Sequence, residues 1–310
     1  MSVLICGSMA YDTIMVFHDR FKNHILPEQV HILNVSFLVP ELRREYGGCA
    51  GNIAYNLKLL GADALIMATV GKDFHPYSQW LAYCGLSQEF VRVVDDSFTA
   101  QAYITTDMDD NQITAFHPGA MSFSHANLVP PNRGIKVGIV SPDGKEGMVE
   151  HAKQFHSAGI PFIFDPGQGM PMFNGEELQK FVELADWVTL NDYEAKLMEE
   201  RTSLSPEQLA AKVKALIVTK GGDGSLIYTQ GGILEIPSAK PKAVVDPTGC
   251  GDAYRAGLLY GLTEEFDWET TGRIASLLGA IKVETPGTQN HGFSLNEFKE
   301  RYRENFAHGF

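Results

Sequence analysis

The sequence predicts an α/β fold of the doubly wound class, in which helices cover both faces of a mainly parallel β-sheet. Short apolar runs of strand length recur along the chain, and most of them alternate with stretches that have the period of an α-helix. Continuous apolar strands separated by helices are typical of a parallel sheet that is buried on both faces. Sheets of this class bind ligands at the carboxyl ends of their strands.

The apolar runs and the helical periods define the expected elements of one domain that spans residues 1–310. We expect strands at residues 3–6, 64–70, 136–140, 161–165, 187–190, 216–219 and 225–228. We expect helices at residues 50–60, 74–83, 145–157, 175–184, 192–201, 206–214, 251–261 and 267–283.

Two regions, at about residues 13–45 and 98–118, depart from this pattern and alternate with the period of two that half-buried strands show. In the second region two such strands flank the polar turn 107–111, which predicts a β-hairpin. We place both regions in a small β-sheet at the ligand edge, where it would act as a lid. An ordinary extension of the sheet edge is the alternative. Because an exposed sheet with an apolar face needs a cover, we expect a homodimer formed through this lid.

The composition excludes some classes of partner. The chain has 38 acidic and 25 basic residues and a net charge of −13, so it has no general attraction to nucleic acid or to an anionic membrane surface. The amino terminus lacks the positive and apolar regions of a signal peptide, and no stretch approaches the length of a membrane span. We therefore expect a cytoplasmic protein that acts on a small molecule.

The strongest functional signal is the segment Asp-Pro-Thr-Gly-Cys-Gly-Asp-Ala at residues 246–253. A proline turn leads through two glycines into a helix, where the N–H groups of Gly249, Cys250 and Gly251 would form an anion site suited to phosphoryl transfer. Asp252 could simply cap this helix. However, a carboxylate in an anion pocket opposes phosphate binding, and removal of a proton from a hydroxyl would explain its presence. We therefore predict that Asp252 is a general base.

The glycine-rich segment 47–52 and Asp12 point to hydroxyl binding. Gly47 and Gly48 would let a polar ligand approach the backbone beside the Asn52 amide, although a flexible turn with a helix cap fits equally well. Asp12 follows the first strand, at the ligand edge, and its carboxylate can accept hydrogen bonds from two neighbouring ribose hydroxyls. A turn-forming aspartate is the alternative for this position.

Two further segments are candidates for nucleotide contacts. Thr219, Gly221, Gly222 and Gly224 follow a strand in a loop that is not a Walker A motif, and a hairpin turn is the alternative. Asn191 and Glu194 stand three residues apart where a helix begins, and their oxygens suit Mg²⁺ held through water. An ordinary capping box is at least as good an explanation for the second pair.

Taken in order, these segments resemble the ribokinase-like (PfkB) kinases of sugars and nucleosides from Gly7 to about Gln289. The closest likeness is to bacterial adenosine kinases. It rests on the segments Gly-Ser-x-Ala-x-Asp at 7–12, Ser-Phe-Leu-Val at 36–39, Phe-x-Pro-Gly-Ala-Met at 116–121, Asn-Asp-Tyr-Glu at 191–194, Gly-Asp-Ala-x-Arg-Ala-Gly at 251–257 and Glu-x-x-Gly-Thr-Gln at 284–289. The chain departs from those enzymes at Met172, where they carry an arginine.

The resemblance implies that ATP and Mg²⁺ phosphorylate the 5′-hydroxyl of adenosine, with Asp252 as the base and the amides of residues 249–251 as the anion hole. It implies that the nucleoside is bound by Ser8, Asp12, Ser36, Gly47, Gly48, Asn52 and Phe116. It implies that Asn191 and Glu194 order Mg²⁺ and phosphate, that Thr219, Gly221, Gly222 and Gly224 meet ATP, and that Asp246 and Thr248 are candidates for a monovalent cation such as K⁺.

A broader nucleoside kinase or a ribose-type sugar kinase is the nearest alternative, because both would use the same mechanism. A protein that only binds nucleosides would be expected to have lost the base, yet Asp252 and both flanking glycines are present.

Overall fold

The computed structural model describes residues 2–25, 32, 34–109, 111–307 and 309–310. Within these residues the main β-sheet contains nine strands. The strands, in sheet order, are β13 (Gly232–Ile236), β12 (Ser225–Thr229), β11 (Ala215–Thr219), β10 (Trp187–Asn191), β9 (Phe162–Phe164), β8 (Ile135–Val140), β1 (Ser2–Cys6), β4 (Asp63–Gly71) and β5 (Ser87–Val94). Neighbours from β11 to β5 pair in parallel, and β12 and β13 are antiparallel additions at one edge. The predicted mainly parallel sheet is confirmed.

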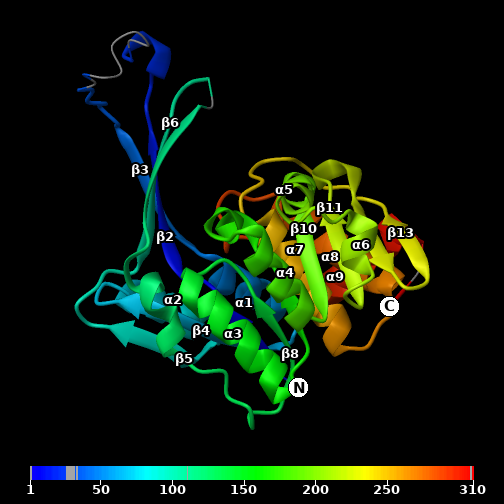
Figure 1. Cartoon of the computed structure of the whole chain (residues 1–310). Helices are drawn as coiled ribbons and strands as arrows, with labels where there is room; N and C mark the ends of the chain where they lie inside the picture. The colour runs from blue at the N-terminus through cyan, green and yellow to red at the C-terminus, as the bar shows by residue number, and fades with distance from the viewer. Residues whose placement is uncertain (1, 26–31, 33, 110, 308) are drawn as a thin grey trace.

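Helices cover both faces of this sheet (Figure 1). They are α1 (Cys49–Leu59), α2 (His75–Tyr83), α3 (Lys145–Ala158), α4 (Gly175–Leu184), α5 (Asp192–Thr202), α6 (Pro206–Ala210), α7 (Cys250–Thr263), α8 (Trp268–Lys282) and α9 (Leu295–Phe306). Within the described residues, no helix is long and apolar enough to cross a membrane.

The two faces of the sheet form two separate cores because successive residues of a strand point to opposite sides. In β1, Val3 and Ile5 belong to the core that α1, α2, α7, α8 and α9 share, whereas Leu4 and Cys6 belong to the core under α3, α4, α5 and α6. A strand that is buried on both faces has no polar alternation, which is why the sequence shows continuous apolar runs.

A smaller sheet stands apart from the main one and rises away from it as a long ribbon (Figure 1). We call it the small sheet; it contains, in order, β3 (Glu41–Gly47), β2 (Ala10–Val16), β6 (Ala100–Thr106) and β7 (Gln112–His117). β2 pairs antiparallel with β3 and parallel with β6, and β6 and β7 form the expected hairpin. The predicted small sheet is confirmed, and it begins directly after the carboxyl end of β1.

Several elements differ from the sequence-based expectation. In the first small-sheet region, the described part of residues 17–40 contains the 3₁₀ helix η1 (Phe21–Asn23) and no strand. Part of the expected turn 107–111 lies outside the described residues. Helix α6 ends at Ala210, before the predicted end of the helix at residue 214. Strands β5 and β13 and helix α9 were not predicted; β5 and β13 are the two edge strands of the main sheet and are only partly buried, and α9 is largely polar.

Candidate active site

Helix α7 begins at the predicted glycine turn and places Asp252 in its first turn. The N-cap residue Gly249 has φ 79° and ψ 1°, a left-handed conformation that glycine adopts at little cost. The N–H of Cys250 donates to the Pro247 carbonyl at 3.1 Å, whereas the N–H groups of Gly249 and Gly251 donate to no acceptor among the described residues. Among the described residues, two of the three N–H groups predicted to form the anion hole, those of Gly249 and Gly251, therefore have no acceptor and lie at the positive end of the helix dipole.

The carboxylate of Asp252 is held by Asn52. The Asn52 Nδ2 donates to Asp252 Oδ2 at 2.8 Å, and no backbone N–H of the described residues donates to this carboxylate. A helix-capping role would require such a bond, so the geometry favours the base. Burial raises the pKa of Asp252 to about 6, although the hydrogen bond from Asn52 and the charge of Arg255 oppose the rise. Asp252 is thus mostly ionised at neutral pH and has the proton affinity that suits a general base.

The glycine pair Gly47-Gly48 brings the start of α1 close to the turn that follows β1. Gly48 has φ 86°, and a Cβ there would lie 2.5 Å from the Ser8 carbonyl oxygen. A Cβ on Gly47 would lie 2.4 Å from Asp12 Oδ2. Gly48 requires glycine, because backbone atoms fill the space that a side chain would need, and a side chain at Gly47 would displace the Asp12 carboxylate. Ser8 and Asp12 therefore lie next to the start of α1, which carries the buried Asn52.

Gln289 fixes the orientation of the Asn52 side chain. The Gln289 Nε2 donates to Asn52 Oδ1 at 3.0 Å and to the Tyr77 hydroxyl at 2.6 Å. Its Oε1 accepts a hydrogen bond from Trp80 Nε1 at 2.8 Å. Since Oδ1 of Asn52 accepts from Gln289, its Nδ2 is the atom that turns to Asp252. Sequence reasoning noted Gln289 only as part of the resembling segment 284–289 and gave it no role.

Asp12 and Phe116 lie on the same face of the small sheet. The register pairs Asp12 with Glu45 and Ala102, and it pairs Ala102 with Phe116. Paired residues of neighbouring strands point to the same face, so these four side chains form one row. Burial and the charge of Glu45 raise the pKa of Asp12 to about 6, and the Phe116 side chain is 53% exposed. Ser36 is exposed in the chain that precedes β3.

Asn191 and Thr219 are register partners at the carboxyl ends of β10 and β11. Asn191 Oδ1 accepts from the Glu194 N–H at 2.7 Å, and Glu194 Oε2 accepts from the Asn191 N–H at 2.7 Å. The capping box that the sequence left as an alternative is therefore formed. A carboxylate has about four lone-pair sites, so this cap leaves Glu194 able to bind Mg²⁺ through water. Burial also raises the pKa of Glu194.

The loop between β11 and β12 is a hairpin, as the alternative interpretation expected. Gly221 and Gly222 are exposed, and a Cβ on either would meet no described atom within 4 Å. Gly224 has φ 85°, and a Cβ there would lie 2.2 Å from the Ile236 carbonyl oxygen. Gly224 is therefore required by the packing of the hairpin, whereas Gly221 and Gly222 offer an open backbone surface.

Asp246 and Thr248 lie in the turn before α7, next to a buried ammonium group. The Asp246 carboxylate accepts from the N–H groups of Thr248 and Gly287, both at 2.9 Å. Lys282, which is 0% exposed, donates from Nζ to the carbonyls of Asp246 and Thr285 at 2.9 and 3.1 Å. Carboxylate and carbonyl oxygens suit K⁺. The oxygens of Asp246 and Thr248 suit a monovalent cation. The Lys282 ammonium would add a second positive charge at the same turn.

Arg255, one turn beyond Asp252 on α7, forms a buried ion pair that the sequence motifs did not reveal. Its Nε and Nη2 donate to the two carboxylate oxygens of Asp165 at 3.0 and 2.9 Å. Asp165 directly follows β9, so the pair lies at the carboxyl edge of the sheet beside the predicted base.

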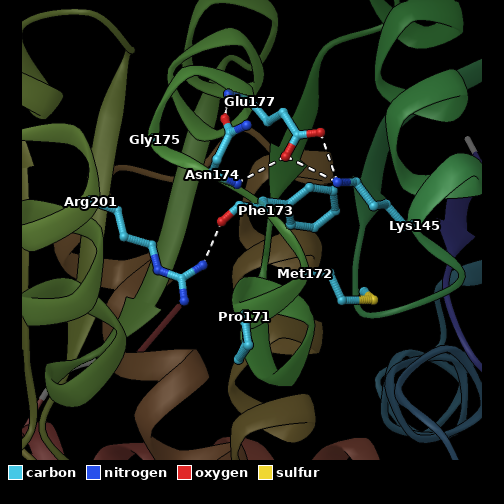
Figure 2. Close-up of a pocket in the computed structure, with 8 residues that line it drawn as sticks. All are labelled: Lys145, Pro171, Met172, Phe173, Asn174, Gly175, Glu177 and Arg201. Atoms are coloured by element: carbon cyan, nitrogen blue, oxygen red, sulfur yellow. Dashed lines mark hydrogen bonds and ion pairs between the residues drawn. The ribbon is translucent and has the colours of Figure 1, made fainter.

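A pocket of about 520 Å³ opens beside the 3₁₀ helix η4 (Gly167–Met172), which follows Asp165. Its lining residues are Lys145, Pro171, Met172, Phe173, Asn174, Gly175, Glu177 and Arg201. Figure 2 shows the Lys145 ammonium at the Glu177 carboxylate, 2.8 Å away, and Arg201 bonded to the Phe173 carbonyl. The lining contains none of the predicted site residues.

Comparisons with known proteins agree with this fold. The model of the pfkB family carbohydrate kinases matches residues 8–293. The chain therefore belongs to the pfkB family and is a kinase, an enzyme that transfers a phosphoryl group.

The chain is similar to several proteins named as nucleoside kinases. A nucleoside kinase from Methanocaldococcus jannaschii is 33% identical over 270 residues, which cover 86% of this chain and 89% of that protein. The solved structure of a Burkholderia thailandensis nucleoside kinase in complex with inosine is 51% identical, covers 99% of both chains and has a TM-score of 0.91. A complex of the same kinase with ADP-inosine has a TM-score of 0.88 and 52% identity, and the match covers 99% of this chain and 97% of that one. The ribokinase-like fold is confirmed.

Proposed function

We propose that the protein is an ATP-dependent nucleoside kinase that phosphorylates the 5′-hydroxyl of adenosine, with Asp252 as the general base. The observation that carries the proposal is the position of Asp252. Its carboxylate is next to the anion-binding start of α7, and Asn52, a predicted ribose contact, donates to it. A base that accepts the hydroxyl proton during phosphoryl transfer must lie next to both the group that binds the ribose and the site that binds the phosphate.

In the proposed reaction the ribose is held by Asp12, Gly48 and Asn52, and the 5′-hydroxyl points to Asp252. The hydroxyl oxygen attacks the γ-phosphorus of ATP in line with the leaving oxygen of ADP, and its proton passes to Asp252. The N–H groups of Gly249 and Gly251 donate to the phosphoryl oxygens as charge develops there. Fixed donors of this kind lower the barrier because they need no reorganisation during the reaction.

Mg²⁺ bound with ATP would supply charge neutralisation between the β- and γ-phosphates. Asn191 and Glu194 would hold it through water, while Thr219, Gly221 and Gly222 contact the nucleotide. Within the described residues, no group of three or more His, Cys, Asp or Glu side chains could hold a metal ion by itself. We therefore expect Mg²⁺ to arrive with ATP, so that metal affinity measured without nucleotide is weak.

A monovalent cation is proposed at Asp246 and Thr248. Replacement of K⁺ by choline in the assay tests this proposal. A lower kcat in choline that K⁺ restores would support the proposal. Equal rates in both salts would contradict it and would indicate that the Lys282 ammonium alone supplies the positive charge at this turn.

A broader nucleoside kinase is the second candidate, because a relative that is 51% identical is solved with inosine. A free-sugar kinase is less well supported, because the half-exposed Phe116 ring on the face of Asp12 offers an aromatic surface for a base.

A comparison of kcat/KM for different acceptors separates these candidates. Adenosine, inosine, ribose and fructose are each supplied with ATP and Mg²⁺, and kcat/KM is measured for ADP formation. The proposal predicts the highest kcat/KM for adenosine. Equal values for adenosine and inosine would establish the broader nucleoside kinase, and a higher value for a free sugar would overturn the assignment.

The small sheet is proposed to act as a lid and as the interface of a homodimer. Leu42, Tyr103 and Ile113 lie on the face opposite Asp12 and are 64%, 42% and 44% exposed. Burial of such a face against a second copy would remove apolar surface from water. Light scattering should give a dimeric mass, and a monomeric mass at all concentrations would contradict the proposal.

A further inference from the structure

The buried pair of Arg255 and Asp165 is a feature that the proposed reaction does not yet use. Their side chains are 7% and 3% exposed. Removing two charges from water is unfavourable, and a buried ion pair is often no more stable than an apolar pair of similar size. Stability alone is therefore a poor explanation for this pair at the ligand edge.

The guanidinium of Arg255 lies among the acidic groups of the site. Besides its two bonds to Asp165, its Nη2 is 3.8 Å from Glu194 Oε2. Its Nη1 approaches the Gly251 carbonyl at 3.4 Å. Arg255 thus joins the ends of β9 and α5 to the first turn of α7, which carries both the anion site and Asp252.

Few of the groups that face Asp252 carry a charge near neutral pH. Burial raises the pKa of Cys49 well above its ordinary value, raises that of Cys250 to about 11 and raises that of Tyr77. These three groups therefore remain protonated. The charges that act most directly on Asp252 belong to Arg255, which stabilises its ionised form, and to Asp165, which opposes it.

We infer that Arg255 is a positioning residue for phosphoryl transfer: held by Asp165, it places a positive charge one helical turn from Asp252 and fixes the turn of Gly251. The inference rests on the proposed function. Without Arg255, the buried Asp165 carboxylate would lose its partner near Asp252, and the base would bind a proton at higher pH. Arg255 acts through these neighbours and needs no contact with the substrate.

The test compares four variants of the full chain: Arg255→Lys, Arg255→Met, Asp165→Asn and the double variant Arg255→Met with Asp165→Asn. The pH dependence of kcat at saturating ATP and nucleoside is measured for each, so that titration of Asp12 in the free enzyme does not enter the profile; nucleoside affinity is measured by calorimetry. Arg255→Met should move the acid limb upward by about 1 pH unit, the lower end for loss of a nearby opposite charge. Arg255→Lys should keep the wild-type limb but lower kcat, because lysine lacks the forked geometry.

The double variant separates charge from packing. With both charges removed, its acid limb should return toward that of the wild type, whereas a merely structural role would leave the pH profile unmoved in every variant. Should Arg255→Met fail to fold, judged by circular dichroism, the Lys and double variants decide the question. A wild-type acid limb in Arg255→Met, or a double variant shifted as far as Arg255→Met, would overturn the inference.

A control and a reference measurement complete the design. Arg133→Met breaks another two-bond arginine–carboxylate pair, with Glu89, at the amino end of β8, and should leave the profile unchanged. The wild type defines the reference with its best acceptor. If it phosphorylates no nucleoside, the proposed function fails. If it does and the Arg255 variants keep its profile, only the inference fails.

Discussion

Replacement of Asp252 by asparagine separates the two roles that a carboxylate in the first turn of a helix can play. The substitution keeps the size and shape of the side chain, and an asparagine Oδ1 can still accept the bond that Asn52 now donates at 2.8 Å. Fold and nucleoside binding should therefore persist. The base is lost, because an amide does not accept a proton at neutral pH.

The expected loss of turnover follows from the contribution of a general base. Such a group accelerates a reaction by about 100- to 10,000-fold, which corresponds to ~2.7–5.4 kcal/mol of the activation barrier. The assay is a coupled measurement of ADP formation at saturating ATP and nucleoside, with nucleoside affinity measured separately by calorimetry. We expect kcat to fall by at least ~100-fold, with an affinity within a few-fold of the wild type.

Asp267 provides the matched control, because it is an aspartate that does cap a helix. Its Oδ1 accepts from the Thr270 N–H at 2.8 Å at the start of α8. Asparagine caps helices as well as aspartate does, so Asp267→Asn should keep both stability and turnover. If Asp252→Asn behaved like Asp267→Asn, Asp252 would be a structural residue and the mechanism would be wrong.

Three further predictions concern the surroundings of the base. Because burial raises the pKa of Asp252 to about 6, the ionised base is lost as pH falls through that value, and kcat at saturating nucleoside should fall about tenfold per pH unit below it; kcat is chosen because Asp12 of the free enzyme also has a pKa of about 6, and a flat kcat profile down to pH 5 would contradict this assignment. Gly48→Ala adds a Cβ 2.5 Å from a carbonyl oxygen, whereas at Gly61, with φ 83°, a Cβ meets no described atom within 4 Å. Urea unfolding should show a loss of ~1–2 kcal/mol for Gly61→Ala and a clearly larger loss for Gly48→Ala, and equal losses would refute the close approach. Gln289→Leu should lower kcat/KM for nucleoside, because Asn52 loses the bond that orients it. Gln88→Leu removes two glutamine hydrogen bonds near α2 and should reduce thermal stability while leaving kcat/KM unchanged; equal kinetic effects would reject the orienting role of Gln289.

The parts of the fold that the sequence predicts are those with strong periodic patterns. Central strands such as β1 are buried on both faces and therefore show continuous apolar runs. Edge strands carry no such signal: β5 has the sequence SQEFVRVV and is only partly buried. Helix α9 is largely polar but buries Phe298, Tyr302 and Phe306 at intervals of four, which is a helical period that the sequence prediction missed.

Site residues within one local motif are predictable, whereas their long-range partners are not. Asn52 and Asp252 are 200 positions apart, and Asn52 and Gln289 are 237 apart, yet both pairs are joined by hydrogen bonds. A motif states what the backbone can do locally; it does not state which amide will orient which carboxylate. The same reason hides the pairing of Arg255 with Asp165 across two elements.

Some local patterns admit two explanations that the structure combines. Asn191 and Glu194 form a complete capping box and still lie at the carboxyl end of β10, where a ligand would bind. Residues 219–224 form a hairpin whose exposed glycines remain accessible. In both cases the structural role is established by geometry, and the proposed contact with ATP remains a prediction.

Identification of the reaction product tests the nucleoside kinase activity most directly. The protein is incubated with adenosine, ATP and Mg²⁺, and the products are resolved by ³¹P nuclear magnetic resonance and mass spectrometry. We expect equal amounts of ADP and AMP, with the new phosphate on the 5′-oxygen and at least ~100-fold slower formation of AMP in the Asp252→Asn sample. Phosphate on another hydroxyl, or hydrolysis of ATP without transfer to the nucleoside, would contradict this expectation.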